Sequence, residues 1–160
     1  MDIMRRAIIV ALVFTSVSAF AAGDQKCSPV EMTSQNNNLI LSGVDQKHQS
    51  QVYIFKNLSS HSIWLDHPVE KRSSSAGWSS YLRVGNSSAL MVNRKNFSIS
   101  CEVIKPGKVD TLDCAKVISV CAPNHIEILK TDKKGTYWLA ENQSWDELVV
   151  ALEKRGVKLK

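Results

Sequence analysis

Short runs of apolar residues recur along most of the chain and predict β-strands. In the clearest run, Phe97, Ile99, Cys101 and Val103 alternate with polar residues, which is the period of a half-buried strand. Further runs, separated by clusters of Ser, Asn, Gly and Lys, cover residues 39–43, 51–56, 62–67, 77–84, 88–93, 112–120, 126–130 and 136–140. Many short strands at this spacing predict a mainly β fold, either an antiparallel β-sandwich or a barrel-like domain.

The end of the chain changes to a helical period. Apolar residues spaced as on one helix face are Trp145, Leu148, Val149 and Leu152. Ser144 and Glu147 can form a capping box at the start, and Gly156 suits the residue after the end. We therefore predict one C-terminal α-helix near residues 145–155, covering one end or an open edge of the sheet.

The first residues do not fit the fold pattern. Arg5 and Arg6 precede a short apolar run at 7–14, and Ala-Phe-Ala follows at 19–21. A basic start, a short apolar stretch and a small-x-small site are typical of a secretory signal peptide. The alternative is an uncleaved membrane anchor, but the run is shorter than a membrane span. We expect residues 1–21 to be removed, 22–37 to form an extended lead-in, and 38–160 to form one β-rich domain.

Composition narrows the class of protein. The chain has 160 residues, of which 44% are hydrophobic and 22% are charged. This length suits one domain and is too short for a barrel enzyme, while the apolar content excludes wholesale disorder. The net charge is +5, and removing Arg5, Arg6 and Asp2 takes away two positive charges and one negative charge, which leaves +4. Scattered lysines at this charge do not indicate nucleic-acid binding.

Four cysteines, Cys27, Cys101, Cys114 and Cys121, follow the leader. An even number of cysteines in an exported domain predicts two disulfides. The alternative is a zinc site, but the sequence contains no C-x-x-C spacing of the kind that binds zinc. A hairpin turning at 106–107 brings Cys101 opposite residues 112–114, which favours Cys101–Cys114 and leaves Cys27–Cys121. A bulge would shift this register and leave the other pairings open.

No catalytic residue is predicted. The serines lie in neither G-x-S-x-G nor S-x-x-K, and the four histidines show no metal-binding spacing. A weaker alternative is that the fold brings two carboxylates together as the acid/base pair of a glycosidase. The candidates for this pair are Glu70, Glu102, Asp110, Asp113 and Glu127. We expect no metal and no cofactor.

The most unusual segment lies between residues 69 and 92. Its cations and aromatic rings are Lys71, Arg72, Trp78, Tyr81 and Arg83. Side chains of these kinds can bind sugar faces, peptides or acidic groups. The alternative is a flexible loop followed by a strand that buries Trp78. We predict these five residues as the binding surface.

Four runs carry a resemblance to a known family. They are VYIFKNLS at 52–59, IWLDHP at 63–68, AGWSSYL at 76–82 and FSISC at 97–101. With these runs, the region from about 50 to 121 resembles the enhanced entry protein family (the EnhB-like group) of Gram-negative bacteria. The resemblance implies an exported, virulence-associated protein that interacts with the host when bacteria enter its cells. It carries no catalytic residues to this chain.

These features together predict a non-enzymatic binding protein of the bacterial envelope, periplasmic or secreted, without a stable membrane span. Its expected partner is another envelope protein, a host protein or an envelope glycan, and not a nucleic acid. The alternatives are a peptidoglycan-acting hydrolase, which needs an acid/base pair in a cleft, and an enzyme inhibitor, which needs a protruding loop. The positive charge disfavours inhibition of basic lysozymes.

Overall fold

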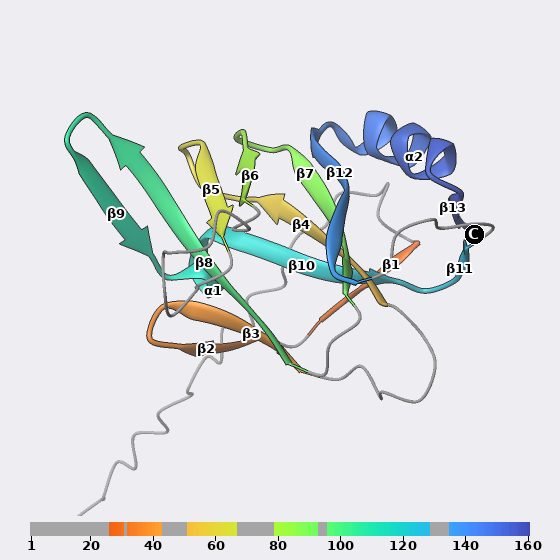
Figure 1. Cartoon of the computed structure of the whole chain (residues 1–160), viewed down its shortest axis with the longest axis horizontal. Helices are drawn as coiled ribbons and strands as arrows, with labels where there is room; N and C mark the ends of the chain where they lie inside the picture. Colours follow the sequence, from red (N-terminus) through yellow and green to blue (C-terminus); the bar gives the residue numbers. More distant parts are fainter. Residues whose placement is uncertain (1–25, 31, 43–50, 67–78, 93–95, 129–134) are drawn as a thin grey trace, which may run out of the picture.

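A computed structural model describes residues 26–30, 32–42, 51–66, 79–92, 96–128 and 135–160 (Figure 1). The predicted signal peptide lies outside these residues. The strands are β1 (Cys27–Pro29), β2 (Thr33–Gln35), β3 (Asn38–Ser42), β4 (Gln51–Asn57), β5 (Ile63–Asp66), β6 (Ser79–Leu82), β7 (Ser87–Val92), β8 (Asn96–Lys105), β9 (Lys108–Leu112), β10 (Ile118–Pro123), β11 (Ile126–Ile128), β12 (Tyr137–Gln143) and β13 (Val157–Leu159). The helices are α1 (Cys114–Val117) and α2 (Trp145–Lys154).

Two main antiparallel sheets form from the described strands. The first has the order β1-β10-β4-β7-β12, and the second has the order β2-β3-β8-β5-β6, with β9 also paired to β8. The sheets are sandwich-like, and the described strands form no closed barrel. The mainly β prediction is therefore confirmed, and of its two architectures the sandwich is right. The lead-in contributes β1 to the first sheet and β2 to the second.

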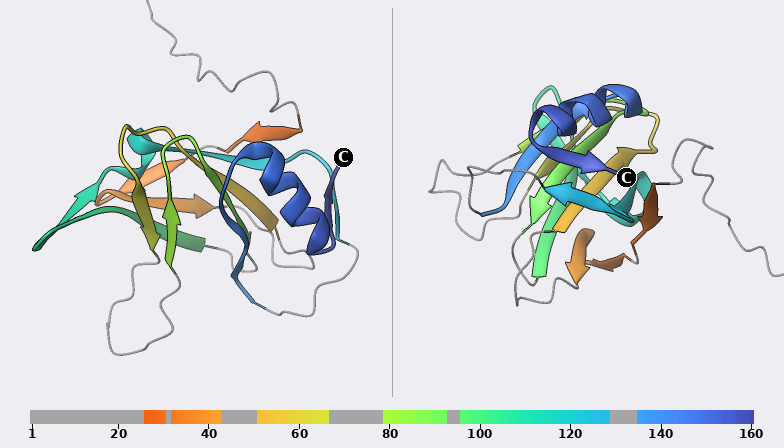
Figure 2. Two further views of the ribbon diagram at one scale, coloured as in Figure 1. Left: turned by 90° about the horizontal axis from the view of Figure 1, so that it is seen from above. Right: turned by 90° about the vertical axis from the view of Figure 1, so that its right-hand side faces the viewer.

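The first sheet is the middle of three layers. Tyr53 and Phe55 on one face of β4 pack in the core shared with the second sheet. Val52 and Ile54 on the other face pack in a separate cluster beneath α2. Figure 2 shows α2 lying over this sheet. Burial on both faces explains why β4 and β7 read as nearly continuous apolar runs rather than as alternating ones.

The predicted helix is confirmed, and it packs at the edge of the first sheet formed by β12. Glu147 accepts hydrogen bonds from the backbone N–H of Ser144 at 3.0 Å and from its hydroxyl at 2.8 Å. Gly156 follows the helix with φ of 77°, as a C′ residue requires. Leu148 and Leu152 are fully buried. They pack on the apolar face of the first sheet at its β12 edge, where α2 lies against β12 and β7. Among the described residues, no helix is long and apolar enough to span a membrane.

The longest strand, β8, organises the second sheet. Along one edge its first half pairs with β3 and its second half with β9, and the opposite edge pairs with β5. The turn at Pro106 and Gly107 joins β8 to β9, and Gly107 has the positive φ of 72° that its turn position needs. Cys101 lies opposite Leu112, as the hairpin argument predicted. The hairpin projects beyond the other strands (Figure 1).

Two disulfides fasten this framework, and they are the pairs that the sequence favoured. Cys27–Cys121 joins β1 to β10, and Cys101–Cys114 closes the base of the β8–β9 hairpin. Both bridges are buried, one in each core cluster. Disulfides of this kind are typical of an oxidising compartment, extracellular or periplasmic.

One predicted strand is wrong. Residues 112–120 do not form a continuous strand, because β9 ends at Leu112, a helical turn follows, and β10 begins at Ile118. The cause is local: the Asp113 side chain accepts a hydrogen bond from the backbone N–H of Ala115 at 3.2 Å and so caps α1. The Cys101–Cys114 bridge holds the first residue of that turn against β8.

Candidate functional site

The outer face of the second sheet carries an aromatic pair. Ile63 and Leu65 in β5 and Leu82 in β6 point into the core and are fully buried. Because side chains alternate along a strand, Trp64 and Tyr81 point outward, and they lie directly opposite each other. Their ring centroids are 5.1 Å apart, with the planes inclined at 53°. Tyr81 is 39% exposed, so the pair is accessible.

The same face continues across β8 and β9. Glu102 lies opposite Trp64 on one side and opposite Thr111 on the other. Two residues further along β8, Ile104 lies opposite Val109; their exposed fractions are 57% and 52%. We call this set the outer-face cluster; it comprises Trp64, Tyr81, Glu102, Ile104, Val109 and Thr111. Exposed aliphatic and aromatic side chains grouped on one sheet face are typical of binding surfaces.

A buried asparagine holds β5 and β6 in place beneath the cluster. Asn57 is 1% exposed, and its amide nitrogen donates to the carbonyl oxygens of His61, at 2.8 Å, and Leu82, at 3.0 Å. Its Oδ1 accepts from the backbone N–H of Ser59 at 2.9 Å and from the Ser59 hydroxyl at 2.7 Å. Both polar atoms are therefore satisfied, and the bonds join the end of β4 to the turn before β5 and to the last residue of β6.

A second polar network fastens β6 to β12. The Oδ1 atom of Asn142 accepts from the backbone N–H of Arg83 at 2.9 Å, and its backbone N–H donates to the Ser88 hydroxyl at 2.9 Å. The Ser88 and Ser80 hydroxyls, both fully buried, are 3.0 Å apart. Asn142 has φ of 54°, a left-handed conformation that asparagine tolerates better than most residues. These bonds tie Ser80 in β6, the backbone of Arg83 and Ser88 in β7 to one another and to β12.

The predicted binding residues have different outcomes. Tyr81 lies in the outer-face cluster. Arg83 is exposed directly after β6, where its backbone is tied to Asn142. Lys71, Arg72 and Trp78 belong to the segment between β5 and β6, outside the described residues.

The sequence reasoning missed Trp64, Ile104 and Val109. The signal for Trp64 and Ile104 was the alternation itself. Trp64 lies between the core residues Ile63 and Leu65, and Ile104 is out of phase with Cys101 and Val103. An apolar residue on the polar side of a strand is a candidate for a contact surface.

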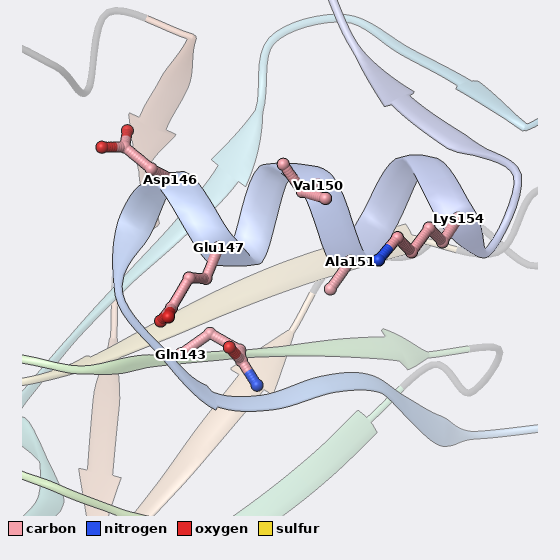
Figure 3. A pocket seen from close by; sticks show the side chains of 6 residues that line it. All are labelled: Gln143, Asp146, Glu147, Val150, Ala151 and Lys154. Carbon is pink, nitrogen blue, oxygen red and sulfur yellow. The ribbon is translucent and has the colours of Figure 1, made fainter.

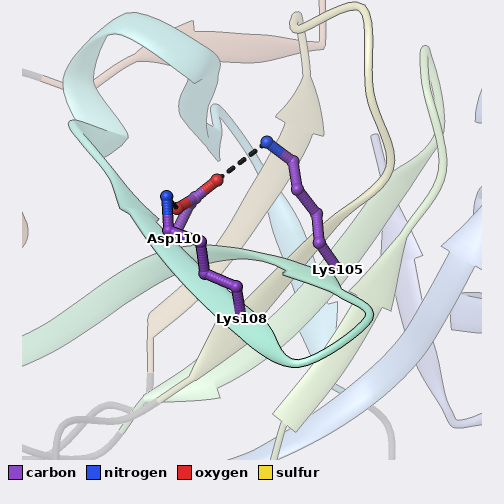
Figure 4. Close-up of polar contacts among 3 residues, drawn as sticks. All are labelled: Lys105, Lys108 and Asp110. Atoms are coloured by element: carbon purple, nitrogen blue, oxygen red, sulfur yellow. Dashed lines mark hydrogen bonds and ion pairs between the residues drawn. The ribbon is translucent and has the colours of Figure 1, made fainter.

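The opposite face of the β8–β9 hairpin is charged. Asp110 lies 2.8 Å from the Lys105 ammonium and 2.6 Å from that of Lys108 (Figure 4). Hydrogen bonds from both ammonium groups lower the pKa of Asp110 to about 2. The projecting hairpin therefore presents aliphatic side chains on one face and an ion-pair cluster on the other.

A shallow groove of about 450 Å³ runs between α2 and the end of β12 (Figure 3). Its lining residues are Gln143, Asp146, Glu147, Val150, Ala151 and Lys154. Glu147 is engaged in the helix cap, and its hydrogen bonds with Ser144 lower its pKa. Figure 3 shows Val150 and Asp146 turned away from Gln143. The groove has no aromatic lining, so it offers less for recognition than the outer-face cluster.

Of the five carboxylates considered for a glycosidase pair, three are held in ion pairs, Glu102 lies in the outer-face cluster, and Glu70 lies outside the described residues. Asp110 is held by two lysines, Asp113 by Lys116, and Glu127 by Lys160. The Lys160 ammonium lowers the pKa of Glu127, whereas a glycosidase acid needs a raised pKa. Within the described ranges, no group of three or more His, Cys, Asp and Glu side chains could hold a metal ion.

Comparisons with protein-family models, with curated proteins and with solved structures found no match to this chain.

Proposed function

We propose that this chain is an exported, non-enzymatic binding protein of the bacterial envelope and that it binds another protein through the outer-face cluster. The observation that carries the proposal is the grouping of Trp64, Tyr81, Ile104 and Val109 on one accessible sheet face. Aromatic side chains are enriched in the centres of protein interfaces. The two disulfides and the leader-like sequence at 1–21 support export.

A protein partner suits this face better than a glycan does. The Trp64 and Tyr81 ring planes are inclined at 53°, so the two rings do not form one flat platform on which a sugar could stack across both. The aliphatic pair Ile104 and Val109 adds an apolar area that a hydroxyl-rich sugar would leave poorly matched. A glycan remains the second candidate, because the carboxylate of Glu102 beside Trp64 can accept hydrogen bonds from sugar hydroxyl groups.

The resemblance to the enhanced entry protein family extends the proposal to the host. Under this extension the partner is a host or envelope protein engaged when bacteria enter host cells. The projecting hairpin is also the kind of element that enzyme inhibitors present, and inhibition is therefore one form that protein binding could take. A hydrolytic role is disfavoured because Asp110, Asp113 and Glu127 are each held by lysines in ion pairs.

Affinity capture from envelope extract tests the proposal. Tyr81→Ala and Ile104→Ser should each abolish or strongly reduce recovery of a specific protein, because truncating a central interface residue costs about 2 kcal/mol or more. Val150→Ser is the matched control, since Val150 is 50% exposed on α2 and lies outside the cluster. Equal recovery by all three variants would reject this surface. Loss of capture after glycan-degrading treatment would favour the glycan instead.

A further inference from the structure

The strand β9 has one edge with which no other described strand pairs. Among the described residues it pairs only with β8. Lys105 and Lys108 lie opposite each other across the two-residue turn, so backbone groups of even-numbered β9 residues bond to β8. The alternation of an antiparallel ladder then turns the N–H and C=O groups of Val109 and Thr111 away from β8. This edge can accept another strand.

The edge is complementary to a second copy of itself. Two antiparallel β9 strands with Val109 on the two-fold axis place Lys108 of each copy directly opposite Asp110 of the other. The two Val109 residues then exchange both N–H···O=C bonds, in phase with their outward backbone groups. The neighbouring register, with Asp110 on the axis, would place two carboxylates opposite each other, which is unfavourable.

We propose that two copies of this chain associate through antiparallel pairing of their β9 edges, with Val109 at the centre. The pairing joins the second sheet of one copy to the second sheet of the other, which gives one continuous sheet. It also brings the exposed Val109 and Ile104 side chains of both copies into one apolar area on the outer face. Because β9 is short, the contact buries less than a standard interface, and the association is weak and concentration-dependent.

Association would also increase the avidity of partner binding, a consequence that rests on the proposed function. Two outer-face clusters on one continuous sheet would engage a repeated or dimeric partner with greater avidity than one. The association itself does not depend on that partner.

Sedimentation velocity of the full exported chain, with both disulfides intact and over a concentration range reaching millimolar, tests the pairing. The natural chain should shift reversibly from monomer towards dimer mass. Lys108→Asp and Asp110→Lys should each weaken association at least about tenfold, because each places like charges opposite each other twice. The combined Lys108→Asp/Asp110→Lys chain should regain association. Lys160→Asp, which breaks the ion pair with Glu127 at the other end of the molecule, is the control and should behave as the natural chain.

Amide hydrogen exchange gives a second readout that identifies the strand. The Val109 N–H should become more protected as the concentration rises, while the Val150 N–H in α2 should not change. Circular dichroism of each variant confirms that it is folded. A natural chain that stays monomeric, single exchanges that leave the dimer intact, or a combined variant that fails to recover would each overturn the proposal. These results leave the partner-capture experiment unaffected, so the two proposals fail separately.

Discussion

Replacing Asn57 by alanine should destabilise the protein more than its small size suggests. The change removes four hydrogen bonds, two donated by the amide nitrogen and two accepted by Oδ1. It also leaves the buried carbonyl of Leu82 without this donor. A net hydrogen bond contributes roughly 0.5–1.5 kcal/mol, and an unsatisfied buried group costs roughly 1–3 kcal/mol. Because solvent can replace the bonds made by the partly exposed Ser59, we expect a total loss of about 3 kcal/mol.

Urea unfolding of the oxidised protein measures this loss. Ser59→Ala is the graded control, because it removes the exposed hydroxyl contacts with Asn57 and His61 but keeps both amide donations of Asn57, and it should cost about 1 kcal/mol. In Asn57→Ala, amide exchange at Trp64 and Tyr81 should accelerate more than exchange in α2, since β5 and β6 lose their common anchor. A loss below about 1 kcal/mol, or one equal to that of Ser59→Ala, would refute the view that Asn57 holds the site in place.

Three further outcomes are expected. Replacing both cysteines of Cys27–Cys121 by alanine should lower the free energy of unfolding by about 4–5 kcal/mol, and replacing those of Cys101–Cys114 should lower it by about 3 kcal/mol. The difference follows from the sequence separations of 94 and 13 residues, and calorimetry should find the larger loss for the first pair. Asp110 should titrate near pH 2 by NMR, so its ion pairs stabilise the hairpin above the ordinary carboxyl pKa of about 4 and are lost as the pH falls towards 2; Lys105→Ala should raise that pKa. Gly107→Ala should cost about 1 kcal/mol, because φ of 72° strains any residue with a Cβ, and faster amide exchange confined to β8 and β9 should show it.

Local signals in the sequence were reliable where the structure is also local. The capping box at Ser144 and the apolar spacing after it define α2, because a helix makes its hydrogen bonds within a few residues. The turn at 106–107 and the alternation from Phe97 define the β8–β9 hairpin, and the hairpin places Cys101 beside Cys114. Two cysteines then remain, and the second disulfide follows by elimination.

Long-range pairing was beyond the sequence. Cys27 in β1 lies opposite Pro123 in β10. The predicted Cys27–Cys121 bridge brings these two segments together, but no pattern in the polar lead-in indicates that residues 27–29 form a strand of the first sheet. The position of α2 on a sheet face depends on β4 being buried on both sides. The continuous apolar run of β4 does not show this, because a doubly buried strand and a buried helix have the same apolar pattern. The short helix α1 was missed because one capping residue, Asp113, interrupts an otherwise strand-like run.

The candidate site was only partly predictable for a related reason. Composition drew attention to the cations and aromatic rings of residues 71–83, and of these Tyr81 lies in the cluster. Trp64, Ile104 and Val109 come from three other strands, and only the register of β5 on β8 and of β8 on β9 brings them to one face. Register depends on tertiary packing, which a single strand's sequence does not contain.

Site-specific photo-crosslinking in the cell that makes this protein tests the central claim most directly. A photoreactive phenylalanine analogue at position 81 lies within the outer-face cluster, and the same analogue at position 150 lies on the exposed surface of α2. We predict one discrete covalent protein adduct from position 81, absent from position 150 and lost when Ile104→Ser is added. Adducts from position 150 but none from position 81 would contradict a binding role for the outer-face cluster.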